Sequence, residues 1–329
     1  MSKRAFVTGA TGFLGIHLMQ QLHKAGWQIT AIHRSPINHP MLNNLPVDWQ
    51  KASLDNVQEL KNALPNKSFT VFHLAADTSQ WKPLHQRQYQ TNVIGTQNLI
   101  EAIREKNLGR MIHVSSISAF GQPKGTISEE TASQAPHGNH NYSLTKWQGE
   151  ERIKKAVQEH DLPAVIVNPC HIIGPWDTNN WIELFKAVLD EDLPGIPPAA
   201  GSFCWVEEVA KAIITATEKG NIGENYILGG PHMSMLELIN EIQRQSQLKL
   251  SKKASPAALL HLIEPIMRVG SWFTGKQPQL TPDRVIMLTH DVLADDSKAQ
   301  KELNYAHKSP KDLVKQTLAW LKNHERNQA

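Results

Sequence analysis

The stretch TGATGFLG, Thr8–Gly15, decides the fold. It joins a short apolar run at 4–8 to a segment at 12–25 whose apolar residues recur with the period of a helix. Glycines at such a strand-to-helix turn allow a tight bend and bring the free N–H groups of the helix N-terminus close to a pyrophosphate. We therefore predict a dinucleotide site, and a glycine-rich turn without a ligand is the alternative. The residues expected to contact the cofactor here are Gly9, Thr11, Gly12, Phe13 and Leu14.

Short apolar runs alternate with longer amphipathic segments through the first half of the chain. This alternation predicts an α/β fold, a Rossmann-type doubly wound parallel sheet with crossover helices on both faces. We expect strands at 4–8, 27–32, 46–50, 69–74, 109–114 and 163–168, and helices at 12–25, 55–63, 84–106 and 142–158.

Helical segments dominate the second half. A Pro/Gly-rich stretch at 193–202 predicts a loop, and 224–228 predicts a short strand. We expect helices at 206–218, 234–246, 256–273 and 310–323. The pattern predicts two parts: a cofactor-binding Rossmann domain (1–175 with 202–230) and a smaller, mostly helical substrate-binding lobe (176–201 with 231–329).

The composition of the 329 residues excludes several classes of protein. Hydrophobic residues make up 40% and charged residues 20%, which is too apolar for a disordered chain. Lys and Arg number 34 against 31 Asp and Glu, and this near balance argues against a nucleic acid partner. Two cysteines, Cys170 and Cys204, are too few for a disulfide framework or a metal cluster, and we interpret them as buried thiols. The histidines show no metal-binding spacing, so we expect no metal.

The N-terminal residues do not have the pattern of a signal peptide, because Met1–Arg4 run directly into an apolar strand. No uninterrupted apolar run of about 18 residues occurs, so we expect no membrane-spanning helix. These features lead us to expect a cytoplasmic protein whose partner is a small-molecule substrate.

The end of the second predicted strand bears on the choice of dinucleotide. NAD sites place Asp or Glu there to accept a hydrogen bond from the ribose 2′-hydroxyl. This chain has IHRS at Ile32–Ser35, without a carboxylate. Arg34 suits the 2′-phosphate of NADP, because a guanidinium pairs with phosphate oxygens in a bidentate manner. We therefore expect NADP rather than NAD, and a solvated surface arginine is the alternative.

Tyr142 and Lys146 lie four residues apart at the start of a predicted helix, so their side chains point to one face. A free tyrosine has a pKa of about 10, and a nearby ammonium lowers that pKa toward the range useful for proton transfer. The spacing alone is weak, since a chance Tyr-to-Lys pair arises in roughly one such chain in four.

Two features upstream strengthen the pair. Ser115 and Ser116 end a predicted strand, which is where ligands bind in parallel sheets, and strand-end capping is the alternative. Asn92 lies within a predicted helix, where asparagine is locally unfavourable. This placement suggests a tertiary role, and a satisfied amide is the alternative.

A set of motifs occurs in the order found in extended short-chain dehydrogenases/reductases: TGATGFLG, HLAA (His73–Ala76), TNVIGT, VSSISAFG, YSLTK and NPCHIIGP (Asn168–Pro175). The similarity spans about 4–230, and SKAQKELNY at 297–305 is also similar to that superfamily. Through AADTSQW, NPCHIIGPWD and GENYILGG, the chain resembles most the dihydroflavonol-4-reductase-like group and the bacterial hopanoid-associated sugar epimerases.

The resemblance implies a role for each motif. Tyr142 would be the general acid in carbonyl reduction, and Lys146 would lower its pKa and hold the nicotinamide ribose. Ser116 aligns with the catalytic Ser/Thr of the family, and Asn92 would support the lysine through backbone or water contacts. The resemblance also implies a homodimer that pairs the helices at 84–106 and 142–158. Further residues that it implies for the cofactor are Ser53, Leu54, Leu74, Ala75, Ala76, Ser115, Pro169 and His171.

Three positions depart from the family pattern. Ser53 replaces an aspartate that contacts adenine, which weakens the match at the adenine site. Asn168 stands where sugar-nucleotide epimerases often carry an arginine. Phe120 replaces a tyrosine, which is a mild change.

The second lobe should select the substrate. A nucleotide-sugar needs cationic groups for its pyrophosphate, and 169–201 contains only Lys186 as a basic residue. The helix at 256–273 carries an apolar stripe, for which packing between the lobes, a lid over an apolar pocket and contact with a membrane surface are the alternatives. Trp81, Ser118 and Trp176 are candidates to line a substrate pocket.

The sequence therefore predicts an NADP-dependent reductase that acts on a ketone or aldehyde of a largely apolar small molecule. One alternative is a sugar-nucleotide epimerase or dehydratase with tightly bound NAD. Another is a non-enzymatic NADP-sensing protein, against which the joint presence of Ser116, Tyr142 and Lys146 argues.

Overall fold

A parallel sheet of seven strands forms the centre of the computed structural model, in the order β10-β7-β5-β4-β1-β2-β3. The structure describes residues 3–178, 180–193, 195–258 and 280–326, together with 260, 262, 264, 265 and 267. The strands are β1 (Arg4–Thr8), β2 (Gln28–His33), β3 (Val47–Lys51), β4 (Phe69–His73), β5 (Leu108–Val114), β7 (Ala164–Pro169) and β10 (Asn225–Leu228).

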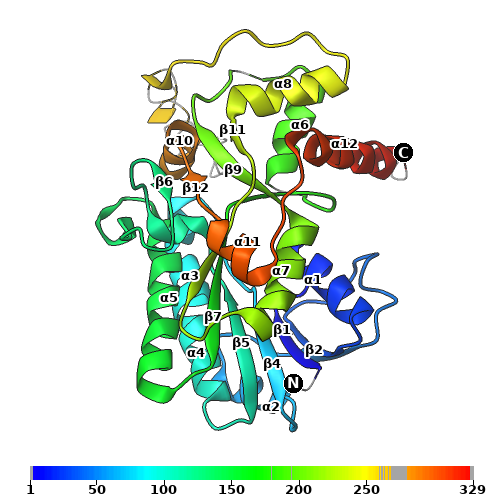
Figure 1. Ribbon diagram of the computed structural model, residues 1–329, viewed down its shortest axis with the longest axis vertical. Coiled ribbons are helices and arrows are strands. Elements are labelled where there is room, and N and C mark those ends of the chain that lie inside the picture. Colours follow the sequence, from blue (N-terminus) through cyan, green and yellow to red (C-terminus); the bar gives the residue numbers. More distant parts are fainter. Residues whose placement is uncertain are drawn as a thin grey trace.

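Helices cover both faces of this sheet (Figure 1). In β1, Ala5 and Val7 enter the apolar core on one face, and Phe6 enters the core on the other. The first core contains α1 (Phe13–Lys24) and α7 (Val206–Lys219), and the second contains α2 (Val57–Ala63), α4 (Gly95–Ile103) and α5 (Asn141–His160). Burial on both faces explains why the inner strands β4 and β7 are mostly apolar, whereas the edge strand β3 is not. The predicted Rossmann-type sheet is confirmed.

The segment at 84–106 is not one regular helix. It comprises α3 (His85–Tyr89), a π-helical turn at Gln90–Ile94 and α4. A π-turn carries one extra residue per turn and changes the directions of neighbouring side chains. The turn contains Asn92, which is buried.

The C-terminal region is mostly helical, as predicted, but it contains short strands that the sequence analysis did not predict. β8 (His171–Ile173), β9 (Ala200–Trp205) and β11 (His232–Ser234) form a three-stranded sheet, so the loop predicted at 193–202 ends within a strand. β6 (Thr126–Ile127) pairs with β12 (Leu293–Ala294). The helices of this region are α6 (Trp181–Leu189), α8 (Met235–Gln245), α10 (Pro282–Thr289), α11 (Ser297–Leu303) and α12 (Pro310–Arg326). Of these, α8 and α12 correspond to the helices predicted at 234–246 and 310–323.

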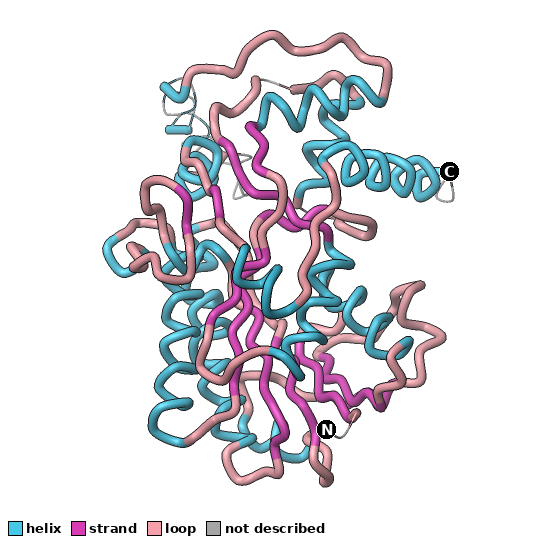
Figure 2. Tube along the Cα trace, viewed as in Figure 1, coloured by secondary structure: helices cyan, strands magenta, loops and turns pink. Residues whose placement is uncertain are grey.

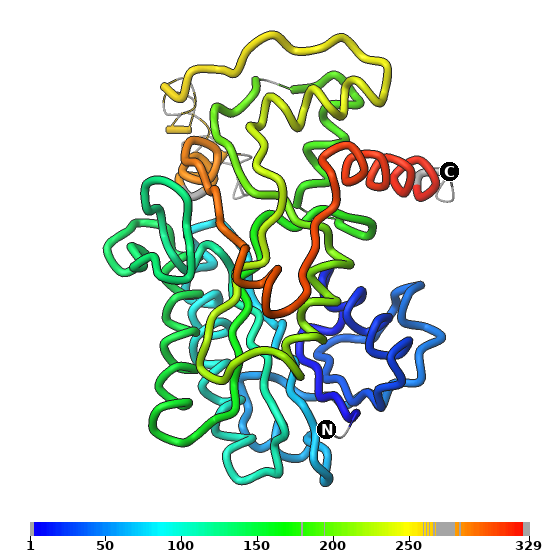
Figure 3. Tube along the Cα trace, viewed as in Figure 1, coloured from blue at the N-terminus to red at the C-terminus, as the bar shows by residue number. Residues whose placement is uncertain are grey.

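One apolar core joins parts of the C-terminal region that are distant in sequence. Figure 3 shows α6, α8 and α12 gathered at one end of the molecule, and Figure 2 shows that helices predominate there. Phe185, Leu238 and Leu313, one from each helix, are fully buried in this core. Of the helix expected at 256–273, the described positions from 257 to 267 are helical, and 268–273 lie outside the described residues.

Among the described helices, none is both long and apolar enough to span a membrane.

The turn between β1 and α1 requires glycine for two reasons. Gly9 has φ +74°, which L-residues rarely adopt, and a Cβ on it would lie 2.6 Å from the backbone nitrogen of Ala75. A Cβ on Gly15 would lie only 2.1 Å from the carbonyl oxygen of Gly9. Helix α1 can therefore start directly above β1 and next to the end of β4.

We predict that Gly9→Ala destabilises the protein by at least about 3 kcal/mol, because positive φ costs about 1–2 kcal/mol and the backbone clash adds to it. Gly26 provides a matched control, since its φ is +75° and no atom lies within 4 Å of the position a Cβ would take. Gly26→Ala should cost only the smaller amount. Urea unfolding measures both, and equal losses in the two variants would contradict the packing argument.

Candidate active site

The N-terminus of α1 fits the phosphates of a dinucleotide. Gly12 caps the helix without a side-chain hydrogen bond, and the first turn contains no acidic residue. The N–H groups of this turn are therefore free for an anion, and the helix dipole favours one. Thr11 and Gly12 are exposed, and Phe13 and Leu14 are partly buried.

The carboxyl ends of β2 and β3 lie beside each other, where the adenine ribose of a dinucleotide is expected. Arg34 is exposed directly after β2, and Lys51 pairs with His33 across the two strands. Ser53 donates its backbone N–H to Glu59 (2.9 Å) and its hydroxyl to Asp55 (3.1 Å). The edge therefore combines two exposed cations with a serine whose polar groups face other side chains.

Ser116 lies immediately beyond β5 and has two roles. Its Oγ accepts the backbone N–H of Ser118 at 3.1 Å and so caps the 3-10 turn Ile117–Phe120. The same hydroxyl interacts with the phenol of Tyr142 and acts to lower the pKa of that phenol. The capping role and a place in the site are therefore compatible.

Tyr142 and Lys146 come from successive turns of α5, as their spacing predicts. Lys146 is only 4% exposed, and its Nζ donates to the carbonyl of Val114 at 3.0 Å. Burial lowers the pKa of Lys146 to about 8, and the nearby carboxylate of Glu150 opposes this change.

The pKa of Tyr142 differs from the expectation that Lys146 lowers it. Burial raises this pKa above its usual value, the interaction with Ser116 acts in the opposite direction, and the charge of Asp77 raises it further. A raised pKa keeps the phenol protonated at neutral pH.

Asn92 is held by hydrogen bonds on both sides of its amide. Its Nδ2 donates to the Asp77 carbonyl (3.0 Å) and to Thr145 Oγ1 (3.1 Å), and its Oδ1 accepts the Asp77 N–H (2.7 Å). Asn92 thereby joins the segment after β4 to α5. The side chain is a satisfied amide, and its partners fix the backbone next to the site.

A buried chain of hydrogen bonds connects the glycine-rich turn to Asn92. Thr96 Oγ1 donates to the Asn92 carbonyl (2.8 Å), so it must accept from His73 Nε2–H (3.0 Å). His73 Nδ1 then accepts from Thr8 Oγ1 (2.7 Å), which accepts the N–H of Ala75 (3.3 Å). The donors and acceptors therefore assign the Nε2–H tautomer to His73. Burial agrees with a neutral ring, because it lowers the pKa of His73 to about 3.

The remaining cofactor candidates lie mostly at the carboxyl ends of the strands. Leu74 donates its N–H to the Thr8 carbonyl (3.1 Å), and Ala76 is exposed. Leu54 is buried and would touch a Cβ on Gly95. Ser115 and Pro169 are also buried, at the ends of β5 and β7.

The aromatic candidates lie in different surroundings. His171 packs against Trp181 and Phe203, with ring centres 4.9 and 5.2 Å away, and burial lowers its pKa to about 4. Trp176, at φ +67°, packs instead against His39, Trp320 and His324. Trp81 precedes the short 3-10 turn before α3, and Ser118 lies next to Ser116.

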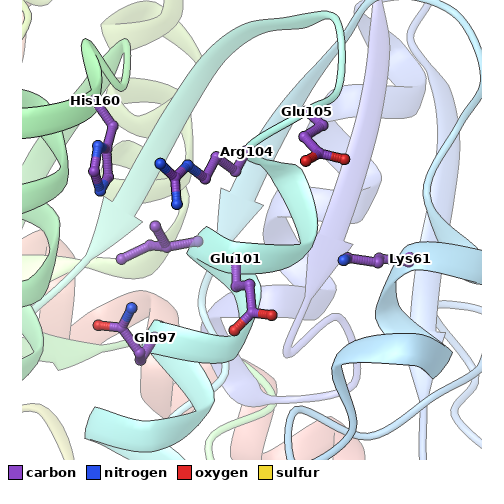
Figure 4. Close-up of a pocket in the computed structure, with 7 residues that line it drawn as sticks. Lys61, Gln97, Glu101, Arg104, Glu105 and His160 are labelled. Carbon is purple, nitrogen blue, oxygen red and sulfur yellow. The ribbon is translucent and has the colours of Figure 1, made fainter.

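Two surface pockets lie away from the candidate site residues. Figure 4 shows the first, about 270 Å³, between α2, α4 and the end of α5, lined by Lys61, Gln97, Ile100, Glu101, Arg104, Glu105 and His160. The second lies along α5. Neither contains a predicted site residue, and the dimer expected on these helices stays a prediction.

Sequence reasoning missed several polar residues around the site. Asp77 contacts Asn92 and Arg87, and Glu150 lies one turn beyond Lys146. Asn168, noted only as a departure, is completely buried and hydrogen-bonded to Glu150. The four-residue spacing from Lys146 to Glu150 is the signal that could have indicated the latter.

Both cysteines are free and buried, and burial raises the pKa of each thiol. Within the described ranges, no group of three His, Cys, Asp or Glu side chains is arranged to hold a metal.

The glycine-rich turn and Ser116, Tyr142 and Lys146 all lie within the part of the chain that a family model matches. The model of the NAD dependent epimerase/dehydratase family matches residues 5–229. The chain belongs to this family. The resemblance to extended short-chain dehydrogenases/reductases is thereby confirmed, and the protein is an NAD(P)-dependent enzyme of a class that acts on CH–OH and C=O groups.

Two relatives match nearly the whole chain. A Synechocystis protein provisionally named dihydroflavonol 4-reductase is 28% identical over 97% of this chain and 94% of its own length. A Stigmatella aurantiaca protein named 4-hydroxy-2-methyl-3-oxo-4-farnesyl-3,4-dihydroquinoline-1-oxide ketoreductase is 29% identical over 92% of each chain.

A solved structure shows the same fold. UDP-glucuronic acid 4-epimerase from Bacillus cereus, crystallised with NAD and a fluorinated UDP-sugar, superposes with a TM-score of 0.78. It is 23% identical to this chain, over 97% of this chain and 99% of its own.

We predict that His73 makes the protein less stable in acid. The unfolded imidazole has a pKa of 6.5, against about 3 in the folded protein, so between these values only the unfolded chain takes up the proton. Stability is therefore lost as the pH falls below 6.5, by roughly 2 kcal/mol from this residue between pH 7.5 and 5.

His73→Gln should reduce the difference between the free energies of unfolding at these two pH values by that amount, and urea titrations measure it. His23→Gln, at an exposed position in the last turn of α1, is the control and should behave as the wild type. An undiminished pH difference in His73→Gln would show that the imidazole is not buried in its neutral form.

Proposed function

We propose that the protein is an NADP-dependent reductase of the extended short-chain class that reduces a ketone or aldehyde of a largely apolar small molecule. The observation that carries the proposal is the interaction of the Ser116 hydroxyl with the phenol of Tyr142, with Lys146 one turn away on α5. Two adjacent hydroxyls can polarise a carbonyl oxygen and protonate it.

The chemistry divides between cofactor and protein. A bound nicotinamide supplies the hydride. Ser116 donates a hydrogen bond to the substrate oxygen, and Tyr142 gives that oxygen its proton. The raised pKa of Tyr142 suits this direction, because the phenol carries its proton at neutral pH. Lys146, with a pKa of about 8, is mainly charged at pH 7, and we propose that its charge stabilises the phenolate only once the proton has been transferred.

The cofactor preference rests on the edge next to β2. Arg34 and Lys51 are both exposed there and can face a 2′-phosphate. We propose that NADP binds to the Rossmann domain predicted from the sequence, residues 1–175 and 202–230. The lobe at 176–201 and 231–329 then selects the substrate.

An apolar substrate is supported by the chemistry of the lobe near β8. Lys186, the only Lys or Arg in 169–201, pairs with Glu183 at 3.3 Å on the exposed side of α6. Asn168, in the place of the family arginine, is buried and offers nothing to a pyrophosphate. The rings of His171, Trp181 and Phe203 form an aromatic cluster beyond the end of β7. The two relatives have names that specify a flavonoid and a farnesylated quinoline.

The second candidate function is a sugar-nucleotide epimerase or dehydratase with tightly bound NAD. It is favoured by the family description and by the likeness to the Bacillus cereus epimerase. Co-purification of NAD with the protein, together with no turnover of any carbonyl compound, would select it. A non-enzymatic NADP sensor would bind NADPH and show no property that depends on Tyr142.

We expect the purified protein to oxidise NADPH with at least one member of a panel of apolar ketones, aldehydes and dihydroflavonols. Tyr142→Phe should lower kcat by about 10²–10⁴-fold, since it removes the general acid. Its affinity for NADPH, measured by fluorescence, should change little. Tyr89→Phe, on α3, is the control. A Tyr142→Phe variant with wild-type kcat would refute the proposal.

We expect Arg34→Ala to raise the KM for NADPH by about 10–100-fold, because a hydrogen bond to a charged group contributes about 1.5–3 kcal/mol. The KM for NADH should stay nearly constant. Lys24→Ala, an exposed lysine at the end of α1, is the control for a general loss of positive charge. Equal changes for both cofactors would contradict recognition of the 2′-phosphate by Arg34.

A further inference from the structure

A closed ring of two buried side chains and one half-buried side chain lies beneath the candidate site. Glu150, on α5, is only 3% exposed. Its Oε1 accepts from Asn168 Nδ2 at 2.5 Å, and its Oε2 accepts from Asn225 Nδ2 at 3.1 Å. Asn225 Nδ2 also donates to Asn168 Oδ1 at 2.9 Å. The ring therefore connects α5 to β7 and β10.

The ring uses all the amide hydrogens of its two asparagines. Asn168 gives one hydrogen to Glu150 and the other to the carbonyl oxygen of Ser116, at 3.0 Å. Asn225 gives its two to Glu150 and Asn168. Neither amide can turn over without placing its oxygen against another hydrogen-bond acceptor. The Ser116 main chain is therefore attached to a group of fixed orientation.

The carboxylate of Glu150 also acts on Lys146 through its charge. Lys146 lies one turn from Tyr142 on α5 and interacts through its charge with Glu150 on its own helix and with the buried imidazoles of His73 and His113 on β4 and β5. Both imidazoles are held neutral by burial, so Glu150 supplies the negative charge that opposes loss of the lysine proton. The partly exposed Lys154 lies 3.6 Å from Glu150 Oε2.

We propose that Glu150 is a positioning residue of the active site, whose carboxylate keeps Lys146 protonated and, through Asn168, holds the main chain of Ser116. It touches neither substrate nor cofactor and acts through these two residues. Its effect on carbonyl reduction rests on the function proposed above, whereas its effect on Lys146 does not.

The effect of the Glu150 charge on the pKa of Lys146 can be tested without an activity assay. The ¹³Cε resonance of Lys146, assigned by its loss in Lys146→Arg, is followed against pH in protein labelled at lysine. The wild type should titrate at about 8, and Glu150→Gln should lower that pKa by about one. Glu151→Gln removes the exposed neighbouring carboxylate, which pairs with Lys154, and should leave the titration of Lys146 nearly unchanged. An unchanged pKa in Glu150→Gln overturns the charge role.

The same charge effect should appear in catalysis. Activity that needs the charged lysine falls as the pH rises through its pKa, so the alkaline limb of kcat/KM should move to lower pH in Glu150→Gln. A merely structural role would lower the unfolding temperature and leave this limb in place. If no carbonyl compound is reduced by the wild type, the proposed function fails, and the NMR titration still decides the role of Glu150.

The link to Ser116 is tested by Asn225→Ser, on the edge strand β10. This change removes the hydrogen bond that fixes the orientation of the Asn168 amide, and it leaves Glu150 charged. It should lower kcat about tenfold, with the KM for NADPH and the titration of Lys146 unchanged. An unchanged kcat overturns the link.

If Glu150→Gln does not fold, Glu150→Asp is used in its place. The proposal expects Glu150→Asp to lower kcat and to leave the alkaline limb of kcat/KM unchanged. A wild-type kcat in this variant refutes the proposal.

Discussion

Two networks of buried side-chain hydrogen bonds lie at the carboxyl ends of the strands, and the geometry of the site depends on them. The chain from Thr8 through His73 and Thr96 ends on the carbonyl of Asn92. The ring of Glu150 and two asparagines ends on the carbonyl of Ser116. Both networks therefore finish on backbone that carries a site residue, and they fix the main chain before any ligand binds.

Local signals predicted the elements around the glycine-rich turn within one or two residues. Helical period and glycine spacing act over a few residues, so β1 and α1 can be identified from them. The π-turn around Asn92 and the short strands β8 and β9 could not be predicted in this way. Their form depends on contacts with α5 and with strands distant in sequence, to which propensity does not respond.

The same limit applies to the site. Spacing and family resemblance predicted Ser116, Tyr142 and Lys146 as site residues, and the structure brings the Ser116 hydroxyl to the phenol of Tyr142. The direction of the pKa change of Tyr142 was not predictable, because burial outweighs the effects that a sequence pattern suggests. Glu150 and Asn168 were missed as a network, since nothing local indicates that a glutamate on a helix meets two amides from separate strands.

The closed ring has a consequence for the evolution of the chain. Replacing any one of Glu150, Asn168 and Asn225 leaves a buried amide hydrogen or carboxylate oxygen without a partner, whereas replacing all three by apolar side chains of similar volume leaves none. Selection for stability alone should therefore oppose the single steps and tolerate the joint one, whereas the proposed role of Glu150 in the active site opposes its loss in any step. Among homologous sequences, these positions should covary as a trio, and lineages that lost the glutamate should have lost both asparagines as well.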